Sequence, residues 1–276
     1  MAAFSFGSAA IFIRYATQVS AISLTFFRLL IASAAVILFA ISTGALRKLG
    51  KHVLFLVAIS GIMLSLHFTA FIFAVKETTV ANATFLVNTS PVMLAVLSPL
   101  ILKERTTSRE YFGVLLAILG ILFVANAGNS FRSFGLPDLS ALLAAFFVAL
   151  YSLVGRYLRT RGVGTASYTA YVYSTAAVVA FLMVEGSGAS AFQPYDPQNI
   201  VAILGLGLIP TALGHSLYNY SLRSVKTVTA NLFPMLEPVI ASALAVPLFQ
   251  EIPNSIQCIG YALILAAVAV VARTLA

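Results

Sequence analysis

Long apolar stretches are the feature that most limits what this chain can fold into. They run for about 20 residues between short polar segments, so that hydrophobic residues form 61% of the chain and charged residues only 9%. A soluble globular domain carries about 25% charged residues, so this chain lacks the polar residues to cover a surface in water. Helices of this length span a bilayer and satisfy their own backbone hydrogen bonds. The sequence therefore predicts an all-α integral membrane protein with the lipid bilayer as its main partner.

Ten membrane-spanning helices are predicted from the positions of these stretches. Residues 1–43 would be about 65 Å long as one helix, so the run folds back at the polar residues 17–20. The predicted spans lie near residues 2–18, 21–43, 52–75, 78–101, 109–126, 138–157, 165–185, 198–220, 227–249 and 254–274.

The basic residues alternate along this series of spans. Twelve of the sixteen Lys and Arg residues lie after spans two, four, six and eight or at the C-terminus, whereas the gaps on the other side hold only Arg14, Lys76 and Arg132. Cytoplasmic loops carry such an excess of basic residues. We therefore expect both termini to be cytoplasmic, and we expect no nucleic-acid partner despite the net charge of +8.

An internal repeat divides the chain. Five predicted spans per copy is an odd number, so the second copy lies upside down relative to the first. We expect two inverted five-helix repeats, residues 1–130 and 131–276, within one membrane domain. Inverted repeats recur in secondary transporters, where substrate binds near the midplane between them. The repeat is seen in Pro91, Glu104 and Gly113, which recur at an offset of 147 as Pro238, Glu251 and Gly260.

The segments around this repeat resemble a known family. Two blocks resemble the signature blocks of the EamA family of the drug/metabolite transporter superfamily: Glu104-Arg105-Thr106 with Glu110 and Gly113, and Leu236-Glu237-Pro238 with Glu251 and Gly260. Phe26-Phe27-Arg28 resembles its second-helix arginine motif. The resemblance implies ten helices, alternating access and export across the inner (plasma) membrane of a bacterium. Within the family, the chain most resembles the YddG-type amino-acid exporters. One departure is that the first copy has Ser90 where the second has Glu237.

Polar side chains within the spans are candidates for substrate contact, because such groups usually face a cavity or another helix. Thr84, Asn88 and Pro91 share one face of the fourth span, and Asn231 and Pro238 share the corresponding face of the ninth. We expect the two faces to meet across the repeat axis. A proline in a helix removes a backbone donor and causes a kink, so Pro91 and Pro238 are either hinges or passive packing kinks.

Two histidines and three aromatic residues extend this candidate site. His67 and Phe71 lie one turn apart in the third span, His215 and Tyr218 lie in the eighth, and Tyr151 lies deep in the sixth. Histidine titrates near neutral pH, so each histidine either contacts cargo, carries protons or is satisfied by neighbouring helices. Aromatic, imidazole and amide groups together favour a small amphipathic zwitterion.

Two charged residues lie in the interior of spans. Arg28 is about 10 Å into the second span and either extends toward the surface or binds a carboxylate, which a guanidinium can hold through two parallel hydrogen bonds. Glu237, in the ninth span, either receives an amino group or a proton, or packs between helices.

These features favour a secondary exporter of amino acids, aromatic ones or other small amphipathic metabolites included. A broad drug or amphiphile exporter would differ only in cavity selectivity, and a passive channel needs a continuous polar pore lining that the spans lack. The chain shows no Ser–His–acid or HExxH pattern, so we expect no enzyme. Its one cysteine and scattered histidines predict neither metal nor cofactor. We expect a monomer with a small-molecule substrate.

Overall fold

The computed structural model of the chain describes residues 1–126, 134–188, 190–250 and 252–273. Each predicted span contains one helix or a series of short helices. The elements are α1 (Ala2–Gly7), α2 (Ala9–Tyr15), α3 (Ala21–Ser42), α4 (Lys51–Glu77), α5 (Val80–Val87), α6 (Ser90–Ile101), α7 (Ser108–Asn126), α8 (Leu136–Thr160), α9 (Thr165–Ser187), α10 (Pro197–Leu206), the π-helix η1 (Gly207–His215), α11 (Ser216–Ser221), α12 (Thr227–Leu232), the 3-10 turn η2 (Pro234–Leu236), α13 (Glu237–Phe249) and α14 (Ser255–Ala272).

The helices have the length and composition of a multi-pass membrane protein. Within the described ranges, eight helices, some of them joined across short breaks, are long and apolar enough to cross a bilayer, and the shorter apolar helix Ala2–Tyr15 precedes them. The same ranges contain no β-strand. The all-α membrane class is therefore confirmed. The count of ten spans and the two inverted repeats stay predictions, and the predicted repeat boundary at 130 and 131 lies outside the described residues.

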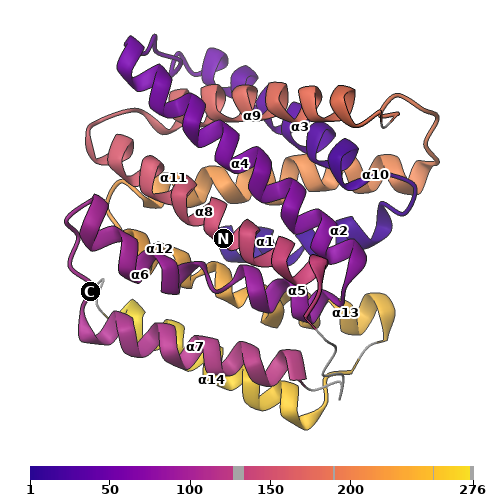
Figure 1. The fold of residues 1–276 in the computed structure, drawn as a ribbon, viewed down its shortest axis with the longest axis vertical. Helices are drawn as coiled ribbons and strands as arrows, with labels where there is room; N and C mark the ends of the chain where they lie inside the picture. The colour runs from indigo at the N-terminus through magenta and orange to yellow at the C-terminus, as the bar shows by residue number, and fades with distance from the viewer. Residues whose placement is uncertain (127–133, 189, 251, 274–276) are drawn as a thin grey trace.

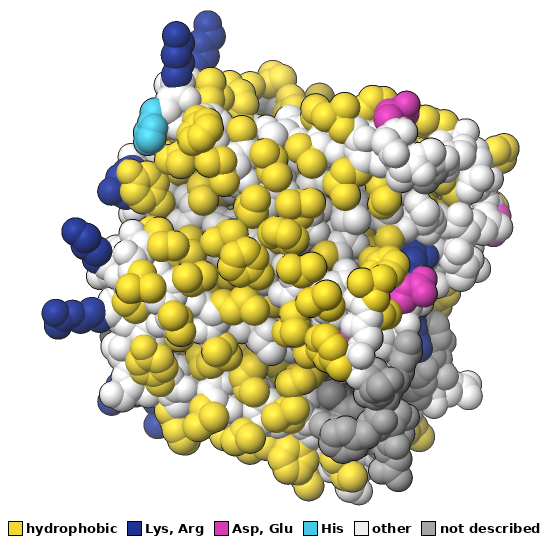
Figure 2. Space-filling model, viewed as in Figure 1, with side chains coloured by type: hydrophobic (Ala, Val, Ile, Leu, Met, Phe, Trp, Pro, Cys, Tyr) yellow, Lys and Arg dark blue, Asp and Glu magenta, His cyan; other side chains and the backbone are white. Residues whose placement is uncertain are grey.

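The helices lie side by side and run in roughly the same direction across the view of Figure 1. α3 packs against α9, and α4 packs against both α8 and α9. α7 and α14 form a pair at one edge of the bundle (Figure 1). Hydrophobic side chains cover most of the face seen in Figure 2, as expected of a surface in contact with lipid tails.

α7 and α14 pack closely in antiparallel directions. Gly113 lies against Val271, whereas Gly120 lies against Gly260 and Ile264, so the partner number falls as the α7 number rises. A Cβ atom at Gly120 would lie 2.7 Å from the Gly260 carbonyl oxygen. The absence of side chains at both glycines is therefore what allows the two backbones to approach this closely.

Charge divides the molecule into two ends. Figure 2 shows Lys and Arg side chains gathered at one end of the helices and acidic side chains toward the other. We call the end that holds the loops after α3, α6, α8 and α11 the basic face. The first residue lies midway between the two ends in the view of Figure 1, and the cytoplasmic position of both termini stays a prediction. Arg132 and Glu251 lie outside the described residues.

Besides the first span, which is broken at Ser8 between α1 and α2, two predicted spans are interrupted halfway. α5 ends at Val87 and α6 begins at Ser90, while α12 ends at Leu232 and α13 begins at Glu237. Pro91 and Pro238 each lie in the first turn of the second half-helix. The backbone N–H groups of a first turn have no acceptor within the helix, so a proline there loses no helical hydrogen bond. The interruptions thus come just before the prolines, and the prolines start new helices instead of kinking continuous ones.

Candidate functional site

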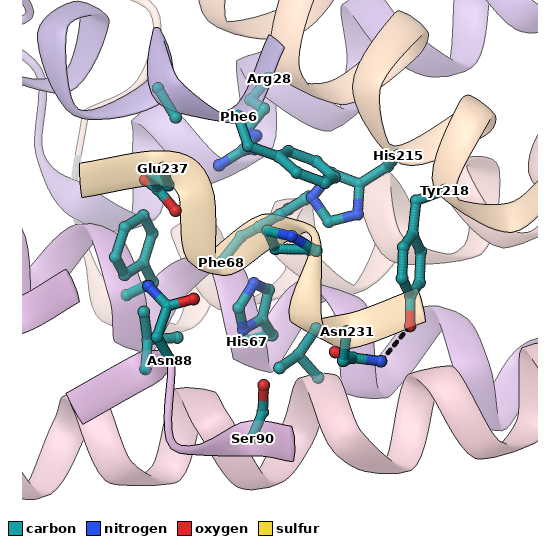
Figure 3. A pocket seen from close by; sticks show the side chains of 15 residues that line it. Phe6, Arg28, His67, Phe68, Asn88, Ser90, His215, Tyr218, Asn231 and Glu237 are labelled. Carbon is teal, nitrogen blue, oxygen red and sulfur yellow. Dashed lines mark hydrogen bonds between the residues drawn. The ribbon is translucent and has the colours of Figure 1, made fainter. Parts of the chain in front are cut away.

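A cavity lies inside the bundle, where both interrupted helices meet α1, α3, α4 and η1 (Figure 3). It contains about 570 Å³ of empty space, part of it open to solvent. Eight of the ten predicted substrate-binding residues line it. The lining residues are Phe6, Ala9, Arg28, His67, Phe68, Phe71, Val87, Asn88, Ser90, Val148, His215, Tyr218, Asn231, Pro234 and Glu237.

Arg28 brings a buried positive charge to the cavity. Its side chain is 2% exposed, its Nε donates to the Thr211 hydroxyl at 2.6 Å, and its guanidinium lies 3.5 Å from the centre of the Phe68 ring. These contacts fix the orientation of the planar group. Its buried Nη1 has no hydrogen-bond partner among the described residues, so the N–H groups on one edge of the guanidinium are unsatisfied.

Glu237 brings a carboxylate to the same cavity. It is the first residue of α13, where the partial positive charge of a helix N-terminus stabilises an acid. The side chain is 7% exposed, and its Oε1 has no hydrogen-bond partner in the described part of the chain. Figure 3 shows Arg28 and Glu237 at the same end of the cavity, yet no ion pair joins these two described residues. The cavity thus holds one unmatched donor and one unmatched acceptor of opposite charge.

The two histidines lie close together among aromatic rings. Their ring centres are 6.4 Å apart. His67 Nδ1 is 2.8 Å from the Ala144 carbonyl oxygen, and its ring is parallel to that of Phe71. His215 instead meets the edges of Phe6 and Phe68. After Arg28 Nη1 and Glu237 Oε1, its Nδ1 is the third buried polar atom of the cavity lining without a partner among the described residues.

A π-helix places His215 in the cavity wall and buries Thr211 behind it. η1 contains Pro210, which cannot supply a backbone donor, and the Thr211 hydroxyl donates to the Leu206 carbonyl oxygen at 2.8 Å. A widened turn of this kind is often found at functional sites. Here it holds the hydroxyl that receives Arg28.

Tyr218 and Asn231 line the cavity and form hydrogen bonds between helices. The Tyr218 hydroxyl donates to the Ser152 hydroxyl at 2.7 Å and accepts from the Asn231 amide. Asn231 also donates to the Thr227 carbonyl oxygen at 3.1 Å. α8, α11 and α12 are therefore joined through one tyrosine.

The remaining predicted residues lie at or near the cavity. Asn88 lines it at the break after α5 and donates to the Thr84 carbonyl oxygen at 2.8 Å. Thr84 is buried outside the lining, and its hydroxyl donates to the Val80 carbonyl oxygen at 2.7 Å. Tyr151 is also outside the lining; its hydroxyl accepts from the Asn219 amide, and its ring centre is 6.2 Å from that of His215. Pro91 and Pro238 lie one residue beyond lining residues.

Glu104 ties the two halves of the chain together at the basic face. Its Oε1 accepts from Arg156 Nε at 2.5 Å, and its Oε2 accepts from the Thr227 hydroxyl at 3.1 Å and the Thr227 backbone N–H at 3.3 Å. Arg156 also donates to the Leu222 carbonyl oxygen at 2.8 Å. One carboxylate thus connects the loop after α6 to α8 and α12. Its partner on α12, Thr227, comes four residues before the cavity residue Asn231.

A second set of contacts joins the halves at the opposite end. The Gln18 backbone N–H donates to Asn199 Oδ1 at 3.1 Å, and its side chain donates to Asp196 Oδ2 at 3.0 Å. Hydrogen bonds from Asn199, the backbone N–H first, lower the pKa of the Asp196 carboxyl. Asp196 therefore stays ionised as the N-terminal cap of α10.

Sequence reasoning missed several lining residues, namely Phe6, Ala9, Phe68, Val87, Ser90, Val148 and Pro234. The repeat held a signal for some of them. Ser90 and Glu237 are related by the offset of 147, and so are Val87 and Pro234. Both members of each pair line the cavity. Transferring the candidate Glu237 to the first half would therefore have found Ser90, whereas Val87 and Pro234 would have stayed hidden because neither was a candidate.

Comparisons with known proteins agree with this architecture. The sequence model of the EamA-like transporter family matches residues 1–126 and 135–273. A protein of Archaeoglobus fulgidus named as an uncharacterized transporter is 24% identical over 246 residues, which are 86% of this chain and 83% of that protein. The transporter YdfC of Bacillus subtilis, also named as uncharacterized, is 27% identical over 86% of this chain and 77% of its own length.

Two further matches extend the comparison. Protein RarD of Escherichia coli is 24% identical over 79% of this chain and 71% of its own length. One crystal structure superposes with a TM-score of 0.79 at 20% identity and covers 99% of this chain and 95% of that one. At this identity the structural match shows the fold alone.

Proposed function

Because this chain belongs to the EamA-like transporter family, we propose that it exports amino acids with apolar or aromatic side chains from the cytoplasm by alternating access. The proposal rests on one observation: Arg28 Nη1 and Glu237 Oε1 are buried in the same cavity, carry opposite charges and lack hydrogen-bond partners among the described residues. Membrane transport in general follows from the family. The cargo, its direction and the mechanism are what we propose.

The unmatched charges favour a ligand that carries both signs. Burying a charge without a partner is costly, and a zwitterion supplies a partner to each group at once. The Arg28 guanidinium, already oriented by Thr211 and Phe68, would receive the carboxylate. Glu237 would receive the ammonium group.

The rest of the lining favours an apolar side chain on the cargo. The same cavity is lined with rings and methyl groups by Phe6, Phe68, Phe71, Val87 and Val148. An aromatic side chain would find edge-to-face partners there, which contribute about 0.5–1.5 kcal/mol per ring pair. The two histidines then supply further hydrogen bonds within reach of the same ligand.

Alternating access is supported by contacts at the two ends of the bundle. Glu104 and Arg156 join the two halves at the basic face, and Gln18 and Asn199 join them at the opposite end. Opening the cavity toward either side would break one set and keep the other. The antiparallel α7–α14 pair, the last helix of each predicted repeat, would serve as the fixed edge of this movement.

The test is counterflow in liposomes that contain the purified protein. We expect saturable exchange of labelled phenylalanine. Unlabelled phenylalanine should inhibit this exchange at a concentration at least tenfold lower than phenethylamine, which lacks the carboxylate, or 3-phenylpropionate, which lacks the amine. Flux that rises linearly with concentration and shows no counterflow would contradict a carrier. Equal competition by all three compounds would favour the broad amphiphile exporter instead.

Two variants assign the two charges. Arg28→Gln should remove the preference for phenylalanine over phenethylamine, and Glu237→Gln should remove the preference over 3-phenylpropionate. A hydrogen bond to a charged group contributes about 1.5–3 kcal/mol, so each preference should fall by roughly 10- to 150-fold. Arg105→Gln, on the basic face, is the matched control and should keep both preferences. Loss of the same preference in both cavity variants would refute the assignment.

A further inference from the structure

A second, separate groove opens on the lipid-facing side of the bundle. It lies between α4 and α8, with the end of α6 at one side, and contains about 850 Å³ of empty space, including the part open to its surroundings. These three helices lie at the front of the view in Figure 1. The lining is apolar apart from one end. It consists of His52, Leu56, Ile59, Met63, Ile101, Leu150, Leu153, Val154 and Tyr157.

The groove has the length of one leaflet of a bilayer. His52, Leu56, Ile59 and Met63 follow one another on one face of α4, and eleven residues of helix rise by about 16 Å. This is about half of the 30 Å hydrocarbon core. The groove runs from the basic face to the middle of the bundle, as a single acyl chain would.

The open end of the groove at the basic face carries positive charge. The Arg161 guanidinium lies 3.6 Å from the centre of the Tyr157 ring, and its Nη1 donates to the Tyr157 carbonyl oxygen at 3.2 Å. His52 is exposed at the same end, next to Lys51, and Lys103 follows Ile101 by two residues.

Two acidic side chains near the basic face, Glu104 in the loop after α6 and Glu110 in the first turn of α7, are already paired. Glu104 is bound by Arg156 and Thr227. Glu110 accepts from the Thr229 hydroxyl at 2.6 Å and lies 3.6 Å from Lys226 Nζ. Neither carboxylate therefore neutralises the cations at the groove, and an anion placed beside Arg161 meets net positive charge.

We propose that this groove is a binding site for an anionic phospholipid. One acyl chain lies along Leu56, Ile59 and Met63, and the phosphate group lies between Arg161 and His52. Basic pockets between membrane helices on the cytoplasmic side bind anionic headgroups by this combination of contacts. The site is distinct from the central cavity, shares none of its lining residues and does not depend on the cargo proposed above.

Native mass spectrometry of the full-length protein tests this site without any transport measurement. The purified chain is mixed with equal amounts of phosphatidylglycerol and phosphatidylcholine of the same acyl chains. We expect one phosphatidylglycerol to stay bound with at least a tenfold preference. Equal retention of the two lipids overturns the proposal, and so does a protein dimer that excludes lipid, since a second copy would then fill the groove.

Two substitutions locate the bound lipid. Ile59→Trp should fill the groove and abolish retention, whereas Leu182→Trp, on an exposed face of α9, should leave retention unchanged. Arg161→Gln should reduce the preference for phosphatidylglycerol severalfold, whereas Lys48→Gln should not. If Ile59→Trp misfolds, the Arg161→Gln variant still tests the proposal. An unchanged preference for phosphatidylglycerol in that variant would refute headgroup binding at the open end of the groove.

Discussion

Neutralising Glu104 should open the cavity toward the basic face. In the structure this carboxylate accepts three hydrogen bonds, one from Arg156 and two from Thr227. Its side chain is 16% exposed and that of Arg156 is 13% exposed, so water screens the pair much less than a surface ion pair. Glu104→Gln keeps the size of the side chain and removes its charge. The closed arrangement loses its strongest contact between the two halves at this end.

The size of the effect follows from these contacts. A hydrogen bond to a charged group contributes about 1.5–3 kcal/mol, and the neutral amide would retain part of it. A net loss of about 2 kcal/mol shifts the equilibrium between closed and open arrangements by roughly 30-fold, because each 1.4 kcal/mol is a factor of ten. Arg156→Gln should have a similar effect. The double variant should add little to either one, since all three remove the same contact.

Thiol labelling measures this shift directly. Ser90→Cys places a thiol in the cavity wall, and Cys258→Ser removes the exposed natural cysteine. A membrane-impermeant methanethiosulfonate applied from the basic face should label the Glu104→Gln protein at least tenfold faster. Gln18→Ala, which breaks the tie at the opposite end, is the matched control and should not accelerate labelling from this side. An unchanged rate in Glu104→Gln, with folding intact, would refute the role of Glu104 in closing the cavity.

Two further variants test the packing that supports the cavity. Gly120→Val should lower the unfolding temperature, because its Cβ would lie 2.7 Å from the Gly260 carbonyl oxygen and overpacking costs about 1–3 kcal/mol. Gly186→Ala is the control and should be neutral, since a Cβ there would meet nothing within 4 Å. Equal thermal shifts in the two variants would contradict the close α7–α14 contact. Tyr218→Phe should destabilise the protein by about 1–2 kcal/mol, since Ser152 and Asn231 lose their shared partner. A denaturation midpoint equal to that of the wild type would show that this hydroxyl does not contribute to stability.

Hydropathy and charge were sufficient to predict where the helices lie, because lipid requires continuous apolar runs and basic residues mark the gaps between them. The breaks inside helices were harder to predict. Pro91 and Pro238 indicated a kink, but the same residue type is equally suited to start a helix, and the choice depends on the neighbours packed around residues 88–89 and 233–236. The π-helix at Gly207–His215 had no signal beyond Pro210.

Polar residues in the spans were a good guide to the cavity, whereas apolar ones were not. Arg28, His215 and Glu237 stand out because lipid excludes them. Phe68 cannot be told from a lipid-facing phenylalanine by sequence, since both environments favour the same residue type. Thr84 shows the opposite difficulty: its hydroxyl is satisfied by the carbonyl oxygen one turn earlier, so a polar residue in a span need not face the cavity.

The two charges of the cavity each occur once, although the sequence predicts two repeats. Ser90 occupies the position that corresponds to Glu237, and α9, the partner of α3 in the packing, contains neither Lys nor Arg. A symmetric pair of acids would bind a cation equally well in two orientations. One arginine and one glutamate at the same end instead define a single orientation for a dipolar ligand. If the two predicted repeats exchange their arrangements during the proposed transport cycle, the cargo would keep one pose throughout, because the charges that orient it are not repeated.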